Sequence, residues 1–199
     1  MLGLPSTTEV NLRVPKETLQ SRAPRLRDMI KDQVESIFWR NKLADKWLSE
    51  GETVKEIHVF EIQLRQRELD KRILPAIAEA IPYTILFILT FGGEAQAWIK
   101  ASDTFYHTDW LPLDGFMLKF EGLNLDAVYE NLTRQIAGGR LNAGGNIAEA
   151  VEIDKRRQKL EREIAALEKK VACEKQFNRR VEMNGELKRL KKELESYRQ

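Results

Sequence analysis

The feature that most constrains the fold is an almost unbroken apolar run from Tyr83 to Phe91, rich in Ile, Leu and Phe. Such a run is typical of a strand buried on both faces at the centre of a sheet. Residues 57–64 predict a second strand, and residues 65–82 are long enough for a helical crossover, which joins parallel strands. Gly92-Gly93 predicts a hairpin, so residues 95–99 are expected to return antiparallel.

Other segments predict the elements around this core. Residues 10–14 alternate apolar and polar side chains, as in a short edge strand or arm. Between Ser21 or Ala23-Pro24 and about Leu43, apolar residues at helical spacing predict an amphipathic helix lying on the sheet: Leu26, Ile30, Val34 and Ile37. Residues 116–120 are a candidate last strand. Asn124 or Asp126 is expected to cap a helix whose apolar stripe is Leu125, Val128, Leu132 and Ile136.

These patterns predict an α/β fold, with α+β as the alternative: a small mixed sheet with a β-α-β-β core flanked by helices, in residues 1–137. Residues 138–147 are predicted to be a linker, since the stretch GGRLNAGGN holds four glycines. The remaining residues, 148–199, are predicted to form a helical hairpin or coiled coil.

Two leucine-rich seams in the C-terminal segment have heptad-like spacing: Leu160, Ile164, Leu167 and Val171, then Leu187, Leu190, Leu194 and Tyr197. The seams are out of register with each other. They fit either one long helix with a stutter, able to form a parallel homodimer, or an antiparallel hairpin. We favour the hairpin, because a seam folded on itself needs no partner chain.

Charge is unevenly distributed along the chain. The whole sequence has a net charge of +2, but residues 151–199 carry 15 Lys and Arg against 10 Asp and Glu, which leaves 18 against 21 in residues 1–150. A basic C-terminal segment indicates contact with nucleic acid or an acidic partner, or only a solvated helical surface. Cys173 is the single cysteine, so no disulfide framework or cysteine-based zinc cluster is predicted. No membrane segment or secretory signal is recognisable, and we expect a cytoplasmic protein.

The sharpest catalytic candidates are Glu61 and Gln63. In nucleases of the restriction-endonuclease type, an acidic residue and a Lys, Glu or Gln alternate at the end of a core strand and hold a divalent metal near the scissile phosphate. The preceding acidic ligand is not identifiable here; Asp45, Glu52 and Glu56 qualify only by proximity. Polar residues at a strand end emerging into solvent would give the same pattern. No other cofactor is expected.

Two basic–aromatic clusters are candidate binding sites for nucleic acid or a protein partner. Trp39, Arg40 and Lys42 form the first, and Lys175, Phe177, Arg179 and Arg180, at the expected tip of the hairpin, form the second. Burial of the first cluster in a core or interface is the alternative interpretation. No phosphate-binding loop, dinucleotide fingerprint or nucleophile elbow is present, and His58 and His107 show no metal-ligand spacing.

Several blocks together resemble one prokaryotic family: LGLPSTTEVNLRVPKE, VKEIHVFEIQLRQRELD with AIPYTILFIL, GLNLDAVYENLTRQIA, and the C-terminal run from LEREIAALEKK to LKRLKKELE. The family is the domain of unknown function forty-three ninety-one. The resemblance implies a setting beside helicases and DNA methyltransferases in phage-defence or restriction-like loci, and it implies no catalytic residues.

From the resemblance, the charge asymmetry and the incomplete catalytic pattern, we expect a non-enzymatic accessory subunit of a DNA-directed complex. Its partners would be a helicase- or methyltransferase-like protein, DNA, or both. The alternatives are a divergent metal-dependent nuclease using Glu61 and Gln63, and a self-associating coiled-coil protein.

Overall fold

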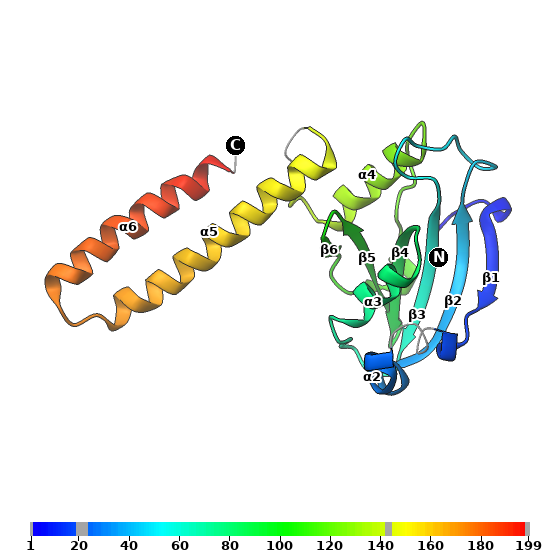
Figure 1. Cartoon of the computed structure of the whole chain (residues 1–199), viewed down its shortest axis with the longest axis horizontal. Coiled ribbons are helices and arrows are strands. Elements are labelled where there is room, and N and C mark those ends of the chain that lie inside the picture. The colour runs from blue at the N-terminus through cyan, green and yellow to red at the C-terminus, as the bar shows by residue number, and fades with distance from the viewer. Residues whose placement is uncertain (1, 19–23, 142–144, 198–199) are drawn as a thin grey trace. The chain divides into compact units, whose positions relative to one another are not determined.

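Strands that follow one another along the chain lie side by side in a seven-stranded mixed sheet, in the order β1-β2-β3-β4-β5-β6, with β7 also pairing β5 (Figure 1). The strands are β1 (Glu9–Arg13), β2 (Val34–Leu43), β3 (Ile57–Leu64), β4 (Thr84–Phe91), β5 (Glu94–Ala101), β6 (Thr104–His107) and β7 (Leu111–Pro112). The computed structural model describes residues 2–18, 24–141 and 145–197. It divides the chain into two compact units, Met1–Arg140 and Leu141–Gln199. Residues 142–144 of the predicted linker lie outside the described residues.

The predicted centre of the sheet is confirmed. β3 and β4 are parallel, with Glu61 opposite Ile88, and β4 and β5 form an antiparallel hairpin. Gly92 and Gly93 form its turn with φ values of 58° and 83°, a left-handed backbone that glycine adopts without steric cost. Residues 85–89 of β4 are buried. The run of apolar residues therefore lies where both sheet faces are covered.

Helices cover both faces of this sheet. One face, which includes Ile62 and Phe87, packs against α2 (Arg27–Gln33) and α3 (Ile73–Ala80) in a single buried cluster. The predicted crossover is thus a helix, although it begins only at Ile73. The opposite face includes the buried Val59, and α4 (Leu125–Ile136) packs against β5 and β6. The mixed α/β architecture is as predicted.

The helix predicted from residue 24 to about Leu43 is wrong in its second half. α2 ends at Gln33, after a short 3-10 turn at Pro24–Leu26, and residues 34–43 form β2. Ser21 and Ala23, the other expected starting points, lie outside the described residues. The helical spacing of apolar residues continued into a segment rich in β-branched and aromatic residues, where β-propensity and pairing with two neighbouring strands decide the structure.

The strand predicted at residues 116–120 is also wrong, for an informative reason. The segment is extended, but its backbone pairs with a side chain. Lys119 N donates to Gln135 Oε1 at 3.0 Å, and Gln135 Nε2 donates to Lys119 O at 2.8 Å. The amide of Gln135 on α4 thus supplies the hydrogen bonds that a neighbouring strand would have made. The cap of α4 is Asn124, whose Oδ1 accepts from Ala127 N at 2.9 Å.

The second unit contains the predicted hairpin, formed by α5 (Ile147–Cys173) and α6 (Phe177–Ser196), which run antiparallel (Figure 1). Leu160, Ile164 and Leu190 are buried between them. Lys191 Nζ of α6 lies 2.8 Å from Glu168 Oε1 of α5. The two seams therefore pack on each other within one chain. Among the described residues, no helix is both long and apolar enough to cross a membrane.

Candidate functional site

Two β-bulges converge on the carboxylate of Glu61. In β1 the pairing shifts between Glu9 and Leu12, and Asn11 within that interval has φ 48°. In β2 it shifts between Trp39 and Asn41, which makes Arg40 the extra residue. Bulges re-aim side chains, and asparagine tolerates the left-handed backbone better than most residues. Arg40 contacts Glu61 directly, and Asn11 contacts Arg40 and Glu9 beside it.

Arg40 and Glu61 form a bidentate ion pair. Arg40 Nε donates to Oε2 at 2.9 Å and Nη2 donates to Oε1 at 3.1 Å. Nη1 reaches Asn11 Oδ1 at 3.4 Å, and the guanidinium carbon lies 4.5 Å from the centre of the Phe38 ring. The Glu61 side chain is only 16% exposed. The guanidinium is therefore held in one orientation, as a planar fork on a carboxylate.

Gln63 lies on the same sheet face as Glu61, as the alternation of β3 predicts. Its Oε1 accepts from Ser36 Oγ at 3.0 Å. A hollow of about 310 Å³ is lined by Asn11, Arg40 and Glu61 among others, and a neighbouring one of about 260 Å³ by Glu61 and Gln63. Sequence reasoning found Glu61 and Gln63 but missed Asn11, because a bulge leaves little trace in a single sequence.

The ion pair determines what this site can bind. Both carboxylate oxygens of Glu61 already accept hydrogen bonds from Arg40, so a divalent cation would compete with the guanidinium for this carboxylate. The structure, within its described residues, contains no group of three or more His, Cys, Asp or Glu side chains able to hold a metal ion. Glu9 also lines the larger hollow, and with Arg40 and Glu61 it gives a formal charge of −1.

The predicted cluster of Trp39, Arg40 and Lys42 is divided between the two faces of the sheet. Trp39 pairs with Phe60 before the bulge, and the bulge then places Lys42 opposite His58, so that both side chains lie on the face opposite Glu61. There the Trp39 and His58 rings stack with centroids 5.0 Å apart. Arg40 alone turns toward Glu61. The sequence predicts one basic–aromatic surface. In the structure, Arg40 lies on one face of the sheet, and Trp39 and Lys42 lie on the other.

His58 is buried at the centre of a row of stacked rings. Its other neighbour is Tyr83, with centroids 4.8 Å apart and ring planes 7° apart. Glu56 accepts from two neighbouring side chains: Oε2 lies 2.8 Å from His58 Nε2, and Oε1 lies 2.9 Å from Lys42 Nζ. Burial lowers the pKa of His58 below its usual value, against the opposing effect of Glu56. The imidazole is therefore neutral at neutral pH.

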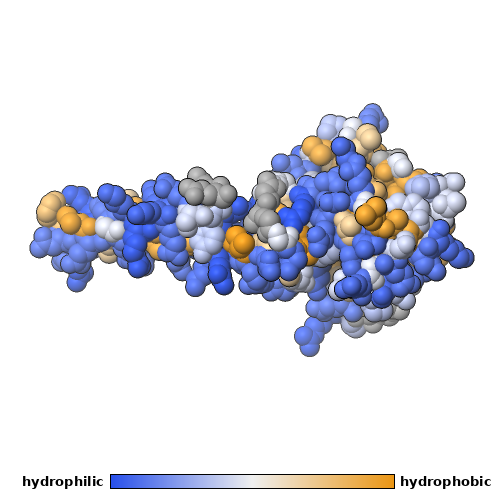
Figure 2. Space-filling model, turned by 90° about the horizontal axis from the view of Figure 1, so that it is seen from above, coloured by the Kyte–Doolittle hydropathy of each residue, from blue (hydrophilic) through white to orange (hydrophobic). Residues whose placement is uncertain are grey.

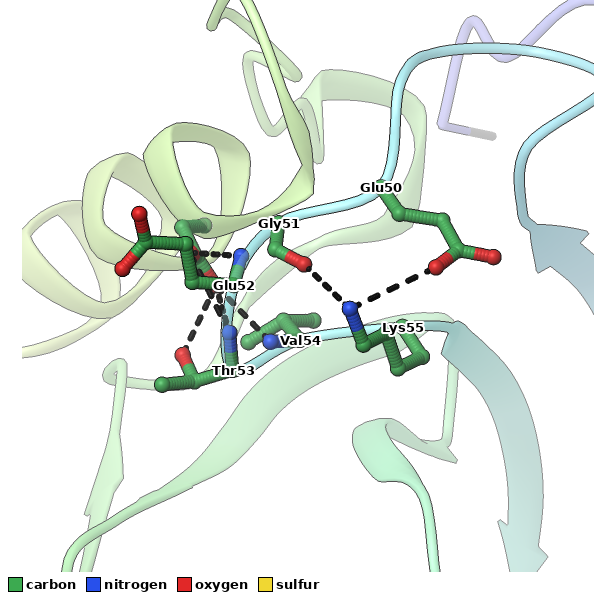
Figure 3. A network of polar contacts seen from close by, with 7 residues as sticks. Glu50, Gly51, Glu52, Thr53, Val54 and Lys55 are labelled. Atoms are coloured by element: carbon green, nitrogen blue, oxygen red, sulfur yellow. Dashed lines mark hydrogen bonds and ion pairs between the residues drawn. The ribbon is translucent and has the colours of Figure 1, made fainter.

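Asp126, in the first turn of α4, fixes the loop that leads into β3. Figure 3 shows the polar contacts of loop residues 50–55. The Asp126 carboxylate accepts from the backbone N–H of Glu52 at 2.6 Å, of Val54 at 2.8 Å and of Thr53 at 3.3 Å, and from the Thr53 hydroxyl at 2.7 Å. Gly51 is required beside it, because an added Cβ would overlap the carboxylate. Partial burial would raise the pKa of Asp126, but these hydrogen bonds outweigh burial and lower it.

The third predicted site lies where α5 and α6 join. Lys175, Phe177, Arg179 and Arg180 are all exposed, Phe177 to 68%. Figure 2 shows hydrophobic side chains at this end of the hairpin, among hydrophilic ones. We call residues 169–181 the hairpin tip.

Fold and site together define a protein of two parts: a mixed α/β unit with an ion-paired polar site on one sheet face, and a helical hairpin with a basic tip. The chain belongs to the family described as a domain of unknown function, DUF4391, whose model matches residues 2–194. Neither a curated protein nor a solved structure matches the chain.

Proposed function

We propose that this protein is a non-enzymatic accessory subunit of a DNA-directed complex, and that it binds nucleic acid or a helicase- or methyltransferase-like partner through the hairpin tip. The single observation that carries the proposal is the concentration of positive charge at the tip. The defence or restriction-like setting is the one that the family resemblance implies.

The cations of the tip are exposed and uncompensated. Residues 169–180 hold five basic residues and one acidic residue: Lys169, Lys170, Lys175, Arg179 and Arg180 against Glu174. Elsewhere on the hairpin some cations are ion-paired, among them Lys155, Arg157 and Lys191. None of the five tip cations forms an ion pair within the described part of the chain. Such a patch attracts phosphates or an acidic surface.

The same tip exposes apolar groups. Phe177 and Val181 are one helical turn apart and both exposed, and Arg180 lies 6.0 Å from the Phe177 ring centre. An exposed aromatic ring among cations can stack on an unpaired base or fill a pocket of a protein partner. Both kinds of partner therefore remain within the proposal.

The test is co-purification with the products of neighbouring genes, together with nucleic-acid binding measured at low and high salt. The variant is Lys175→Glu/Arg179→Glu/Arg180→Glu. The control, Lys188→Glu/Arg189→Glu/Lys192→Glu, makes the same charge change further along α6. We expect the tip variant to lose affinity by at least about tenfold, and the salt slope to fall by about one for each phosphate contact removed. Absence of both complex and nucleic-acid binding, or equal losses in the two variants, would overturn the proposal.

A second candidate is a metal-dependent nuclease at Glu61 and Gln63. It is favoured by the position of both side chains on one face of a core strand that is followed by a parallel crossover, beside two hollows. Cleavage of DNA that requires Mg²⁺ or Mn²⁺ and is abolished by Glu61→Gln, but not by Lys119→Gln, would establish it. Cleavage unchanged by Glu61→Gln would reject it.

Self-association through the C-terminal helices stays a prediction. The buried seam residues Leu160, Ile164 and Leu190 are already used within one chain, so a homodimer would need other surfaces of the hairpin. A solution mass measured over a range of concentrations decides between monomer and dimer.

A further inference from the structure

Tyr83 ends the row of stacked rings and leaves part of its surface uncovered. His58 covers one face of its ring, yet Tyr83 is 46% exposed. A hollow of about 450 Å³ adjoins it, lined by Tyr83, Pro82, Lys100 and Ser102 among others. His58 does not line the hollow, whereas Lys100 of β5, on the other side of β4, does. Tyr83 is thus partly exposed beside the hollow that it lines.

The ring is held in position before any ligand arrives. His58 stacks on Tyr83 from one side and on Trp39 from the other, with ring planes 7° and 5° apart. Glu56 fixes His58 through its ring nitrogen and is itself bonded to Lys42. A ring whose orientation is fixed loses little conformational entropy when a second ring stacks on it.

The charged residues that line this hollow are Lys55, Glu56 and Lys100; Glu56 is paired with Lys42, and Lys100 is the cation available for an anionic ligand. Its side chain is exposed, and its ammonium makes no ion pair with any described residue, whereas Lys55 of the same hollow is bound to Glu50 and to the Gly51 carbonyl. The strand end that carries Lys100 is fixed, because Tyr129 donates to the Lys100 carbonyl at 2.9 Å. A lysine of this kind holds an anionic group as a point charge.

Ser102 is a further residue that lines the hollow. It and Asp103 form the two-residue turn between β5 and β6, and its φ of 54° is the positive value that such a hairpin turn requires at its first central residue.

We propose that this hollow binds a nucleotide, with its base stacked on the outer face of Tyr83 and its phosphate on Lys100. Every base has a π-face, and stacking on an aromatic side chain contributes affinity whichever base is present. The volume of about 450 Å³ lies in the range of small-ligand sites. A free nucleotide and one nucleotide of a single strand offer the same groups. The proposal is independent of the function assigned to the hairpin tip.

The test is calorimetric titration of the full chain with adenosine monophosphate, adenosine, inorganic phosphate and a short single-stranded oligonucleotide. The oligonucleotide is titrated into the tip triple variant, so that binding at the tip does not contribute. We expect one adenosine monophosphate per chain, with adenosine bound more weakly because it lacks the phosphate. Tyr83→Phe should retain affinity, and Tyr83→Ala should lose at least about tenfold.

Lys100→Gln should bring the affinity for adenosine monophosphate down to that for adenosine, while the control Lys119→Gln leaves it unchanged. Tyr83-dependent binding of the oligonucleotide alone identifies a strand as the source of the nucleotide, and binding of adenosine monophosphate identifies the free form. The proposal is overturned if neither probe saturates the protein. It is equally overturned if Tyr83→Ala, with an unchanged circular dichroism spectrum, binds as the unmodified chain does.

Discussion

Arg40 and Glu61 face each other across β2 and β3 and share two hydrogen bonds, of 2.9 and 3.1 Å, at the bulge where Arg40 is the extra residue of β2. The pair is the best-defined polar feature of the sheet. It neutralises a carboxylate that would otherwise be poorly solvated, and it links stability to the candidate site.

Removing the guanidinium should destabilise the α/β unit. We expect Arg40→Ala to lower the free energy of unfolding by about 1–2 kcal/mol, a value reduced because Arg40 is partly exposed. Urea unfolding of Arg40→Ala, Glu61→Gln and the double variant measures the coupling between the two side chains. Lys119→Ala is the control. Additive effects of the two substitutions would show that the pair contributes nothing.

Asp126 should make stability depend on pH in the acid range. Its folded pKa is lowered below the unfolded value, so its contribution is present above the unfolded pKa and is lost as pH falls through the folded pKa. We expect Asp126→Asn to be less stable than the unmodified chain at neutral pH, with the difference shrinking below about pH 4. Urea unfolding at several pH values measures it. A difference independent of pH would contradict the assignment.

His58 should affect the stability of the fold at higher pH than Asp126 does. Because burial lowers its folded pKa, the unfolded chain takes up the proton first as pH falls. The stability contributed by neutral His58 is present above the unfolded pKa of about 6.5 and is lost as pH falls from there toward the folded pKa. His58→Gln should flatten the curve of unfolding free energy below about pH 7. His107→Gln is the matched control, and an equal effect of both would contradict the prediction.

The hairpin should depend on Leu190. It is 8% exposed and packs against α5, while Leu123 in the other unit is 92% exposed. We expect Leu190→Ala to cost about 2–3 kcal/mol and Leu123→Ala close to nothing. Thermal unfolding followed by helical circular dichroism measures both. Similar melting curves for the two variants would show that the seam does not hold the helices together.

The elements that the sequence predicts correctly are those whose signal lies within a few neighbouring residues. The apolar run of β4, the Gly92-Gly93 turn and the Asn124 cap each carry their signal within a few residues, and all three are as predicted. β2 was mistaken for helix because Leu26, Ile30 and Val34 follow helical spacing, and the bulge at Arg40 interrupts the alternation that marks a strand.

The candidate sites depended on distant partners. Glu61 and Gln63 could be placed on one face by counting along β3, but nothing near Glu61 in the sequence points to Arg40 or Asn11. Tyr83 looked like the first residue of a buried strand, and only the pairing of β3 with β4 brings it onto His58. Asp126 resembled a helix cap and instead holds a loop 72 to 74 residues earlier.

The long separation in sequence between Asp126 and the loop that it holds affects the order in which the chain folds. Each strand from β1 to β6 pairs with the next one along the sequence, so the sheet can grow by successive additions, each closing a loop much shorter than the span from Asp126 to residues 52–54. The hydrogen bonds between Asp126 and residues 52–54 close a far longer loop. We expect these bonds to form after the folding barrier is crossed. Asp126→Ala should then speed unfolding and leave the refolding rate almost unchanged, which stopped-flow kinetics would show. The hydrogen bonds of Asp126 would then stabilise a sheet that has already formed. They would set how long the native state lasts rather than how quickly it is reached.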